Sequence, residues 1–218
     1  MQFLLPEFSF LSLHFMPLLD LNLPPNPTIP PDVRLFLREA EHRVERFRQE
    51  RVTPAFVPSD FTAAYTALRA LEESEQAPGR YFCEWGSGFG VAACLAAMLG
   101  FDACGIEAEE ELVEHARRLA DDFGLPVQFA CGSFLPAGKI ADGEFAWLVT
   151  GGPCGHRALG LDPEDFDVIY AYPWPDEERL TAELFARVAR PGAVLATYHG
   201  EGAVRLRKKT GRAASFRA

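Results

Sequence analysis

The feature that most constrains the fold is a regular alternation of strand-like and helix-like segments from residue 80 to residue 200. Short apolar runs alternate with longer segments of helical periodicity, as in βαβ units. Several of these runs have no polar face, which is typical of a parallel sheet that helices cover on both sides. With right-handed crossovers, the sequence predicts an α/β fold with a doubly wound, mostly parallel sheet. The predicted strands are 81–85, 102–108, 126–134, 166–174 and 193–200, and the predicted helices are 90–100, 109–124 and 176–190.

Two helical patterns precede this alternation and predict a small N-terminal helical cap. The first, at 32–50, follows Pro30 and Pro31, and proline suits the first turn of a helix. The second, at 59–75, has Ser59 as its expected N-cap. The apolar stripes at helical spacing consist of Val33, Phe36, Ala40, Val44 and Phe47 in the first helix and of Phe61, Tyr65 and Leu68 in the second.

The two ends of the chain differ in charge. No Lys or Arg precedes Arg34, and prolines interrupt the apolar N-terminal run, so a signal peptide and a membrane anchor are both disfavoured. This run is either a segment docked on the domain or an upstream extension with translation starting at Met16. The C-terminal end, with six basic residues from Arg205 onward and no acidic one, predicts a solvated, partly frayed tail. The expected division is an apolar, proline-rich extension (1–30), the helical cap (31–78), the α/β domain (79–204) and the basic tail (205–218).

Charge and cysteine content exclude some classes of function. The net charge of −10 and the isoelectric point near 5.0 argue against a general nucleic-acid binder, because polyphosphate would be repelled. The five cysteines form no CxxC pair and have no histidine at metal-ligand spacing. We therefore expect no metal site, no disulfides and a reducing, cytoplasmic compartment. The expected partner is a small molecule, and the oligomeric state is left open.

The most informative motif is EWGSGFG at 84–90, directly after the first predicted strand of the domain. Glycines at this point allow a tight turn and a close approach of ligand to backbone. The dinucleotide fingerprint G-x-G-x-x-G would need its third glycine at position 91, which is Val91. Glu84 beside the loop would repel a pyrophosphate and would favour a cationic ligand. A nicotinamide-dependent oxidoreductase is therefore only the third interpretation.

The motif resembles the first motif of the class I S-adenosylmethionine-dependent methyltransferases, an acidic residue followed by G-x-G-x-G. In that family the acid faces the amino end of the methionine, and the glycine backbone accommodates the cofactor. A second acid closes the next strand and accepts the ribose hydroxyls, and Glu107 stands there. Where the family often has an acid that contacts adenine, this chain has Ser133. The resemblance covers about residues 80–200 and implies S-adenosyl-L-methionine as the cofactor. The cofactor-binding residues that it implies are Glu84, Gly86, Ser87, Gly88, Gly90, Glu107, Ala108, Gly132, Ser133 and Tyr170.

The acceptor side departs further from the family. YAYPWP at 170–175 resembles a strand-four motif of members that methylate nitrogen, in which an acid or amide precedes Pro-Pro-aromatic. Ala171 replaces that polar residue, so a partner for an amine nucleophile is missing. An aromatic floor can still position a planar or cationic acceptor, by about 0.5–2 kcal/mol. No catalytic residue is assigned. The candidate acceptor-lining residues are Tyr172, Trp174, Asp176 and His199, of which His199 is also a candidate base.

The end of the chain leaves the family sheet incomplete. The family commonly closes its sheet with a sixth strand and an antiparallel seventh strand, whereas only residues 201–218 follow Gly200 here, enough for one strand at 203–209. We expect a truncated sheet with an open edge, unless the N-terminal segment, the tail or a second copy covers it. Two functions remain. The first is methyl transfer to an unidentified small-molecule acceptor, and the alternative is a catalytically degenerate relative that binds the cofactor or protein partners.

Overall fold

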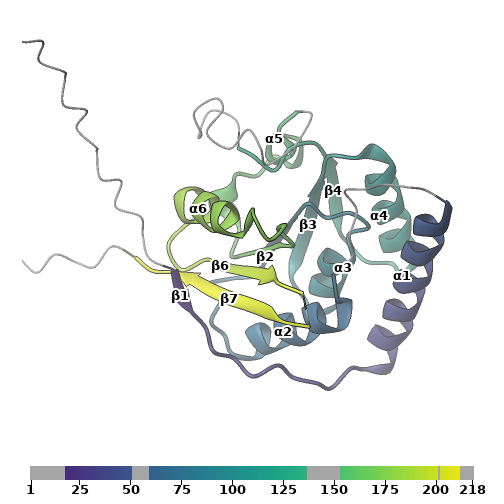
Figure 1. Ribbon diagram of the computed structural model, residues 1–218, viewed down its shortest axis with the longest axis horizontal. Helices are drawn as coiled ribbons and strands as arrows, with labels where there is room; N and C mark the ends of the chain where they lie inside the picture. Colours follow the sequence, from purple (N-terminus) through teal and green to yellow (C-terminus); the bar gives the residue numbers. More distant parts are fainter. Residues whose placement is uncertain (1–17, 51–58, 137–152, 201, 212–218) are drawn as a thin grey trace, which may run out of the picture.

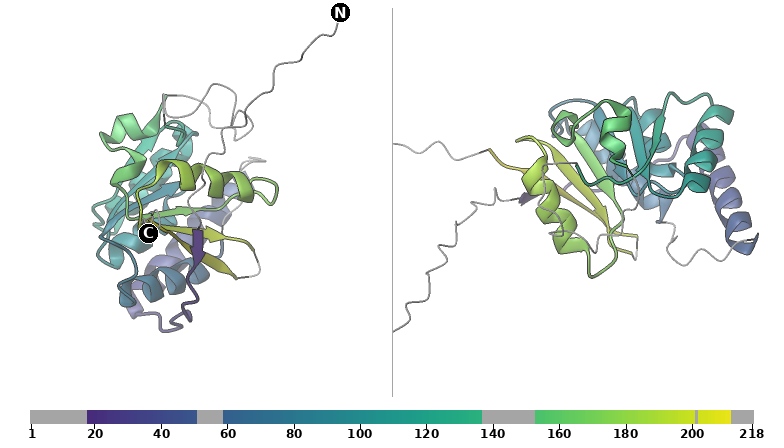
Figure 2. Two further views of the ribbon diagram at one scale, coloured as in Figure 1. Left: turned by 90° about the vertical axis from the view of Figure 1, so that its left-hand side faces the viewer. Right: turned by 90° about the horizontal axis from the view of Figure 1, so that it is seen from above.

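A computed structural model describes residues 18–50, 59–136, 153–200 and 202–211. Its centre is one seven-stranded sheet in the order β1-β7-β6-β5-β2-β3-β4, with helices on both faces (Figures 1 and 2). The strands are β1 (Leu18–Asp20), β2 (Tyr81–Trp85), β3 (Asp102–Glu107), β4 (Gln128–Cys131), β5 (Val168–Ala171), β6 (Val194–Tyr198) and β7 (Val204–Lys209). The helices are α1 (Pro31–Glu50), α2 (Phe61–Glu73), α3 (Val91–Met98), α4 (Glu110–Asp122), α5 (Gly155–Leu159) and α6 (Glu178–Val188), with a short 3-10 turn at Pro163–Asp165.

The five central strands are parallel, which confirms the predicted sheet. β2 pairs with β3 on one side and with β5 on the other, so the strand order changes direction between β2 and β5. In open α/β sheets, ligands bind outside the carboxyl ends of the strands at such a switch point. The loop 86–90 leaves β2 at this point and the segment 172–177 leaves β5 beside it. The fold therefore brings the two motifs of the sequence to the same edge.

The end of the sheet is covered by the N-terminal segment, which was one of the alternatives to an open edge. Residues 204–209 form β7, antiparallel to β6, and the N-terminal residues 18–20 form β1, antiparallel to β7. β1 thereby runs in the direction of β6 and covers the outer side of β7 (Figure 1). The basic run joins the sheet because its side chains alternate: Leu206 is buried on one face, and Arg205 finds acidic partners on the other. This confirms the strand predicted at 203–209, and for residues 205–209 the expectation of a frayed tail is wrong.

The two N-terminal helices form as predicted, with one correction at a cap. The residue that caps α2 is Asp60, whose Oδ1 accepts a hydrogen bond from Ala63 N at 2.9 Å, and Ser59 lies one residue before it. Aspartate accepts this bond as well as serine does, so the choice of Ser59 was wrong by one residue. The boundaries proposed at residues 30 and 78 remain predictions. The buried stripe of α1 consists of Val33, Phe36, Leu37, Ala40, Val44 and Phe47.

Two apolar clusters flank the sheet. One lies between the sheet and α1 to α4, and includes Phe82, Tyr170 and Leu206 from three strands. The other lies between the sheet and α6, and includes Trp85, Ile169 and Leu195. The helices of the cap thus share a continuous core with the sheet. In the described part of the chain, no helix combines the length and the apolar composition that crossing a membrane requires.

Candidate active site

The glycine loop turns sharply at the end of β2. Gly86, Gly88 and Gly90 all have positive φ, at +70°, +52° and +66°, which only glycine adopts without strain. The amides of Gly86 and Ser87 both donate to the Ile106 carbonyl on β3, at 2.9 and 3.0 Å. A Cβ at Gly90 would overlap the ring of Phe129, whereas one at Gly86 would meet no atom within 4 Å. The loop is therefore packed on its inner side and open at Gly86.

Glu84 lies buried beneath this loop. Its Oε2 accepts a hydrogen bond from Ala93 N, in the first turn of α3, at 2.9 Å. Burial raises the pKa of Glu84 to about 8; the nearby carboxylate of Glu107 adds to the effect, and the backbone amides of Ala92 and Ala93 oppose it. A buried carboxyl that keeps its proton near neutral pH gains its charge at little cost when a cation arrives. This is the environment expected of a group that faces a cationic ligand.

Glu107 connects the end of β3 to the glycine loop. One carboxylate oxygen, Oε2, accepts from Gly88 N at 2.8 Å, and the other, Oε1, accepts from Glu109 N at 3.0 Å. A carboxylate oxygen has two lone pairs, so each oxygen keeps one acceptor position for a hydroxyl. The half-buried side chain is therefore held in place by backbone amides with acceptor capacity to spare.

The turn after β4 forms the next wall. Gly132 N donates to the Glu107 carbonyl at 2.8 Å, which joins this turn to the end of β3 beside Ala108. Ser133 Oγ accepts from Leu135 N at 3.0 Å, so the hydroxyl caps its own turn. The ring of Phe134 stacks on Trp85, with centroids 5.3 Å apart and planes 8° from parallel. Backbone groups and flat side chains thus line this wall, where the family often has an acid.

Two buried hydroxyls near the loop indicate a polar ligand. Ser87 Oγ is buried and makes no hydrogen bond to any residue that the structure describes, and the buried Tyr170 hydroxyl interacts with Ser59 alone among the described side chains that could bond it. Tyr170 lies on β5 in register with Glu84 on β2, so the two side chains share one face of the sheet. A buried polar group without a partner costs about 1–3 kcal/mol. An open backbone turn, the unpartnered Ser87 hydroxyl, the buried Tyr170 hydroxyl and two carboxylates fit a zwitterionic, hydroxyl-rich cofactor.

The segment after β5 carries the exposed aromatic residues. Tyr172 and Trp174 are 37% and 48% exposed, unusual values for such large side chains. Tyr172 contacts Tyr198 at the end of β6 edge to face, with ring centroids 4.8 Å apart. Burial raises the pKa of Glu177, whose carboxylate accepts from Trp174 N, and Asp176 is exposed. Tyr172 and Trp174 thus lie at the carboxyl edge of the sheet, in the segment that follows β5, and β5 pairs with the strand that leads into the glycine loop.

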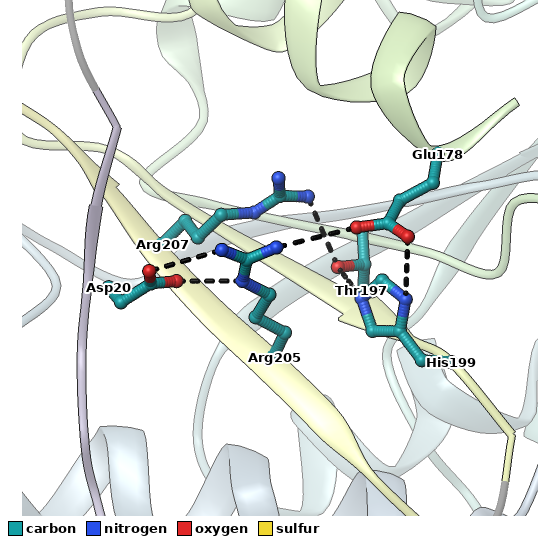
Figure 3. A network of polar contacts seen from close by, with 6 residues as sticks. All are labelled: Asp20, Glu178, Thr197, His199, Arg205 and Arg207. Atoms are coloured by element: carbon teal, nitrogen blue, oxygen red, sulfur yellow. Dashed lines mark hydrogen bonds and ion pairs between the residues drawn. The ribbon is translucent and has the colours of Figure 1, made fainter.

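His199 lies on the other side of β6, in a network that reaches the sheet edge (Figure 3). Its Nε2 is 2.7 Å from Thr197 Oγ1, and its Nδ1 is 3.2 Å from Glu178 Oε2. Arg207 Nη2 donates to Thr197 Oγ1, so the arrangement that satisfies all these groups has the threonine hydroxyl donating to Nε2 and Nδ1–H donating to Glu178. Burial lowers the pKa of His199, and Arg207 and Arg205 lower it further against the effect of Glu178. Both ring nitrogens of the candidate base are therefore engaged.

Comparison with known proteins was made for sequence and for structure. No family profile matches the chain, and no curated protein matches its sequence. An RNA methyltransferase from Salinibacter ruber, in complex with S-adenosyl-L-homocysteine, is 20% identical with a TM-score of 0.50, over 73% of this chain and 97% of that one. A methyltransferase from Geobacter sulfurreducens is 18% identical with a TM-score of 0.51, over 84% and 92%. An O-methyltransferase from Bacillus cereus, in complex with the same ligand, is 18% identical with a TM-score of 0.50, over 78% and 66%.

The chain has the class I methyltransferase fold. At these identities the likeness concerns the fold alone, and the roles of individual residues rest on the geometry above. Within this fold, the implied cofactor residues Glu84, Gly88 and Glu107 lie together at the switch point, and Tyr170 lies under them. Tyr172 and Trp174 lie at the same edge, whereas His199 is bound into a separate network. In the part of the chain that is described, no three His, Cys, Asp or Glu side chains are placed to hold a metal ion.

Several residues of the site were not found from the sequence. Asp20 binds the Arg205 guanidinium with both carboxylate oxygens, at 2.7 and 3.1 Å, from a segment interpreted as an extension. Arg207 is 7% exposed, and burial lowers its pKa, although the sequence placed it in a solvated tail. The alternation of apolar and basic residues in 204–207 was a signal for a strand. Nothing local marks Asp20, because its partner is 185 residues away.

Proposed function

We propose that the protein transfers a methyl group from S-adenosyl-L-methionine to a small-molecule acceptor. The observation that carries this proposal is the open glycine turn at Gly86 flanked by the two carboxylates Glu84 and Glu107, at the switch point of a class I methyltransferase fold. The cofactor would supply a methyl group on a sulfonium, which is already activated for transfer. The protein then has to bind, orient and exclude water.

We use the term cradle for four residues at the switch point, namely Glu84, Gly86, Glu107 and Tyr170, and the geometry supports a role for each of them. Glu84, buried under the loop, would face the ammonium end of the cofactor and take up its negative charge when that cation binds. Glu107 would accept the ribose hydroxyls with its two spare lone pairs while its amide partners keep it in place. Gly86 leaves the backbone accessible, and the Tyr170 hydroxyl offers a polar contact from below.

The acceptor would lie against Tyr172 and Trp174. Their exposed rings can hold a planar or cationic molecule beside the cofactor site by stacking, at about 0.5–2 kcal/mol. A small molecule is favoured over RNA because the net charge of −10 would repel a polyanion. Three of the five free cysteines are buried thiols, namely Cys83, Cys94 and Cys104, which supports a reducing, cytoplasmic location.

A second candidate function has its own support. Ala171 leaves the aromatic pair without a preceding polar group, and both ring nitrogens of His199 are engaged. A chain with an intact cradle and no available base fits a relative that binds the cofactor and acts through partners. The same features are also compatible with methyl transfer to an acceptor that needs no deprotonation. An activity assay is therefore needed to distinguish the two functions.

The first experiment is calorimetric titration of the full chain with S-adenosyl-L-methionine and, separately, with S-adenosyl-L-homocysteine. Micromolar affinity for both is the expected result, and absence of binding by a folded protein would overturn the proposal.

The second step is a methyl-transfer assay over a panel of aromatic and amine acceptors. Trp174→Ala should raise KM for the acceptor tenfold or more without changing cofactor affinity. Leu19→Ala, another exposed apolar residue, is the matched control. Binding without transfer over the whole panel would favour the second candidate.

A further inference from the structure

The glycine loop has an anchor between α1 and α4 that its motif does not explain. Phe89 stands between Gly88 and Gly90, two residues with positive φ, and its ring is 2% exposed. This ring stacks on His115 of α4, with centroids 4.8 Å apart and planes 19° from parallel. Phe47 of α1 meets Phe89 edge to face at 5.3 Å and meets His115 edge to face at 5.2 Å. Three rings from three elements are thus in mutual contact behind the loop.

This cluster completes a set of supports, one for each of the three residues 88–90. Gly88 N is held by Glu107, the Phe89 ring is held by His115 and Phe47, and Gly90 packs against Phe129 and Ala116. Glycines at 88 and 90 allow many backbone conformations. Holding the Phe89 ring in one place restricts the loop to the few conformations that are compatible with that position. His115 and Ala116 are neighbours on α4, so one turn of this helix supports two consecutive loop residues.

We propose that His115 is a positioning residue for the cofactor, acting through Phe89, and that the neutral imidazole ring stacked on Phe89 keeps the glycine loop in its binding shape. The inference rests on the proposed cofactor site and adds a contribution from α4 and from the helical cap. A ring is required at this position because a flat face must cover the flat face of Phe89. Ordering the loop in advance removes part of the entropy cost of binding.

The surroundings of His115 lower its pKa, mainly through burial. Burial is the main cause that lowers its pKa; Arg118 and Arg46 lower it further, and Glu111 and Glu114 act in the opposite direction. Arg43 and Glu50 of α1 face the same hollow and bring one charge of each sign. The ring is therefore neutral at neutral pH. Protonation below its ordinary pKa of about 6.5 would bring a charge against two phenyl rings and toward Arg46.

The test compares His115→Ala with His115→Phe in calorimetric titrations with S-adenosyl-L-homocysteine at pH 7.5. We expect His115→Ala to weaken binding about tenfold or more and His115→Phe to remain within about threefold of the wild type, because phenylalanine restores the stacked ring. His42→Ala, an exposed histidine of α1, is the matched control and should bind as the wild type does. Equal affinity of His115→Ala and the wild type would overturn the proposal.

A pH series separates positioning from general support of the fold. Wild-type affinity should fall as the pH drops below the lowered pKa of His115, and His115→Phe should lack this acid limb. An identical acid limb in both proteins would contradict the inference.

A readout without ligand keeps the two proposals separable. Hydrogen exchange of the Gly88 and Gly90 amides, which donate to Glu107 and to the Ser87 carbonyl, should be at least tenfold faster in His115→Ala than in the wild type and unchanged in His115→Phe. If the wild type binds no cofactor, the proposed function fails, and exchange still decides whether His115 shapes the loop. Unchanged exchange in His115→Ala would refute that role.

Discussion

The two halves of the carboxyl edge are built in different ways. The cofactor half is local in sequence: Glu84 binds the amide of Ala93 nine residues away, and Glu107 binds that of Gly88 across 19 residues. The other half, at β6, β7 and β1, is called the acceptor half because the proposed acceptor-lining residue Tyr172 contacts Tyr198 there. It is assembled from distant segments, since Asp20 of β1 holds Arg205 of β7 across 185 residues and Arg205 also reaches Glu178 of α6. Contacts between residues close in sequence can be recognised as a motif, whereas contacts between distant segments cannot be recognised in this way. We expect mutations in the first half to change cofactor affinity and mutations in the second half to change stability.

They also differ in charge. The cofactor half places two carboxylates, Glu84 and Glu107, close together with no cation bonded to either among the described residues, and burial keeps one of them protonated. In the acceptor half, the carboxylates of Asp20 and Glu178 are matched by the guanidinium groups of Arg205 and Arg207. One half has room for a positive ligand, and the other is internally neutralised.

The largest effect is expected from Gly90→Val in the cofactor half. A side chain there would overlap Phe129, and a β-branched residue resists positive φ, so we expect a loss of about 3 kcal/mol or more and no measurable binding of S-adenosyl-L-homocysteine. Gly124→Ala is the control, because Gly124 has φ of +61° with open space around it. It should cost about 1 kcal/mol and leave binding intact. Urea unfolding measures the free energy of unfolding of the two variants, and calorimetry measures their affinity for S-adenosyl-L-homocysteine. A Gly90→Val variant that still binds would show that this loop conformation is not required for binding.

The next effect concerns the pH dependence of stability. Because Glu84 has a pKa of about 8 in the folded protein and an ordinary value of 4.5 when unfolded, the unfolded chain releases its proton first as the pH rises. Stability should therefore fall between about pH 4.5 and 8, by roughly 3–5 kcal/mol. Glu84→Gln should flatten this slope in urea unfolding at pH 5.5 and 8.5. The same slope in both proteins would show that Glu84 is not the titrating group.

Thr197→Val tests the acceptor half. The hydroxyl is fully buried, accepts from the buried Arg207 and contacts the more exposed His199, so its removal leaves the Arg207 guanidinium without this partner and should cost about 1–3 kcal/mol. Cofactor affinity should not change, since the network lies outside the cradle. Thr66→Val is the control, because the Thr66 hydroxyl bonds only to the Ala63 carbonyl of its own helix among the described residues. A large loss of cofactor affinity in Thr197→Val would show that the two halves are coupled.

The smallest effect is expected from Asp20→Asn at the sheet edge. The side chains of Asp20 and Arg205 are about half exposed, at 49% and 47%, so the pair should contribute about 0.5–1 kcal/mol at low salt. The difference from the wild type should shrink at high salt, because exposed charges are screened. Arg205 lowers the pKa of Asp20, so this contribution is present above about pH 4 and is lost as the pH falls through the lowered value. A salt-independent difference would point to a packing role for β1.

The sequence predicted most of the cofactor half. Alternating periodicity located β2 to β6, and the loop at 86–90 with Glu84 and Glu107 identified the edge where they meet. It was wrong at the cap of α2, where Asp60 and not Ser59 accepts the bond, and where charge was taken to mean solvent exposure, as at Arg207 and Lys209. Ser133 and His199 were identified as candidates, yet their hydrogen bonds within the protein were outside the reach of sequence.

By itself, then, the sequence determined the parallel core and the place of the cradle, because strand and helix periods and glycine turns act over a few residues. Only the tertiary structure decided how the sheet closes, which ring nitrogens of His199 are engaged and that Phe47 and His115 hold Phe89. These depend on which distant segments pair. β1 has three residues, too few for a periodic signal, and it is specified by backbone pairing with β7 and by the bond between Asp20 and Arg205.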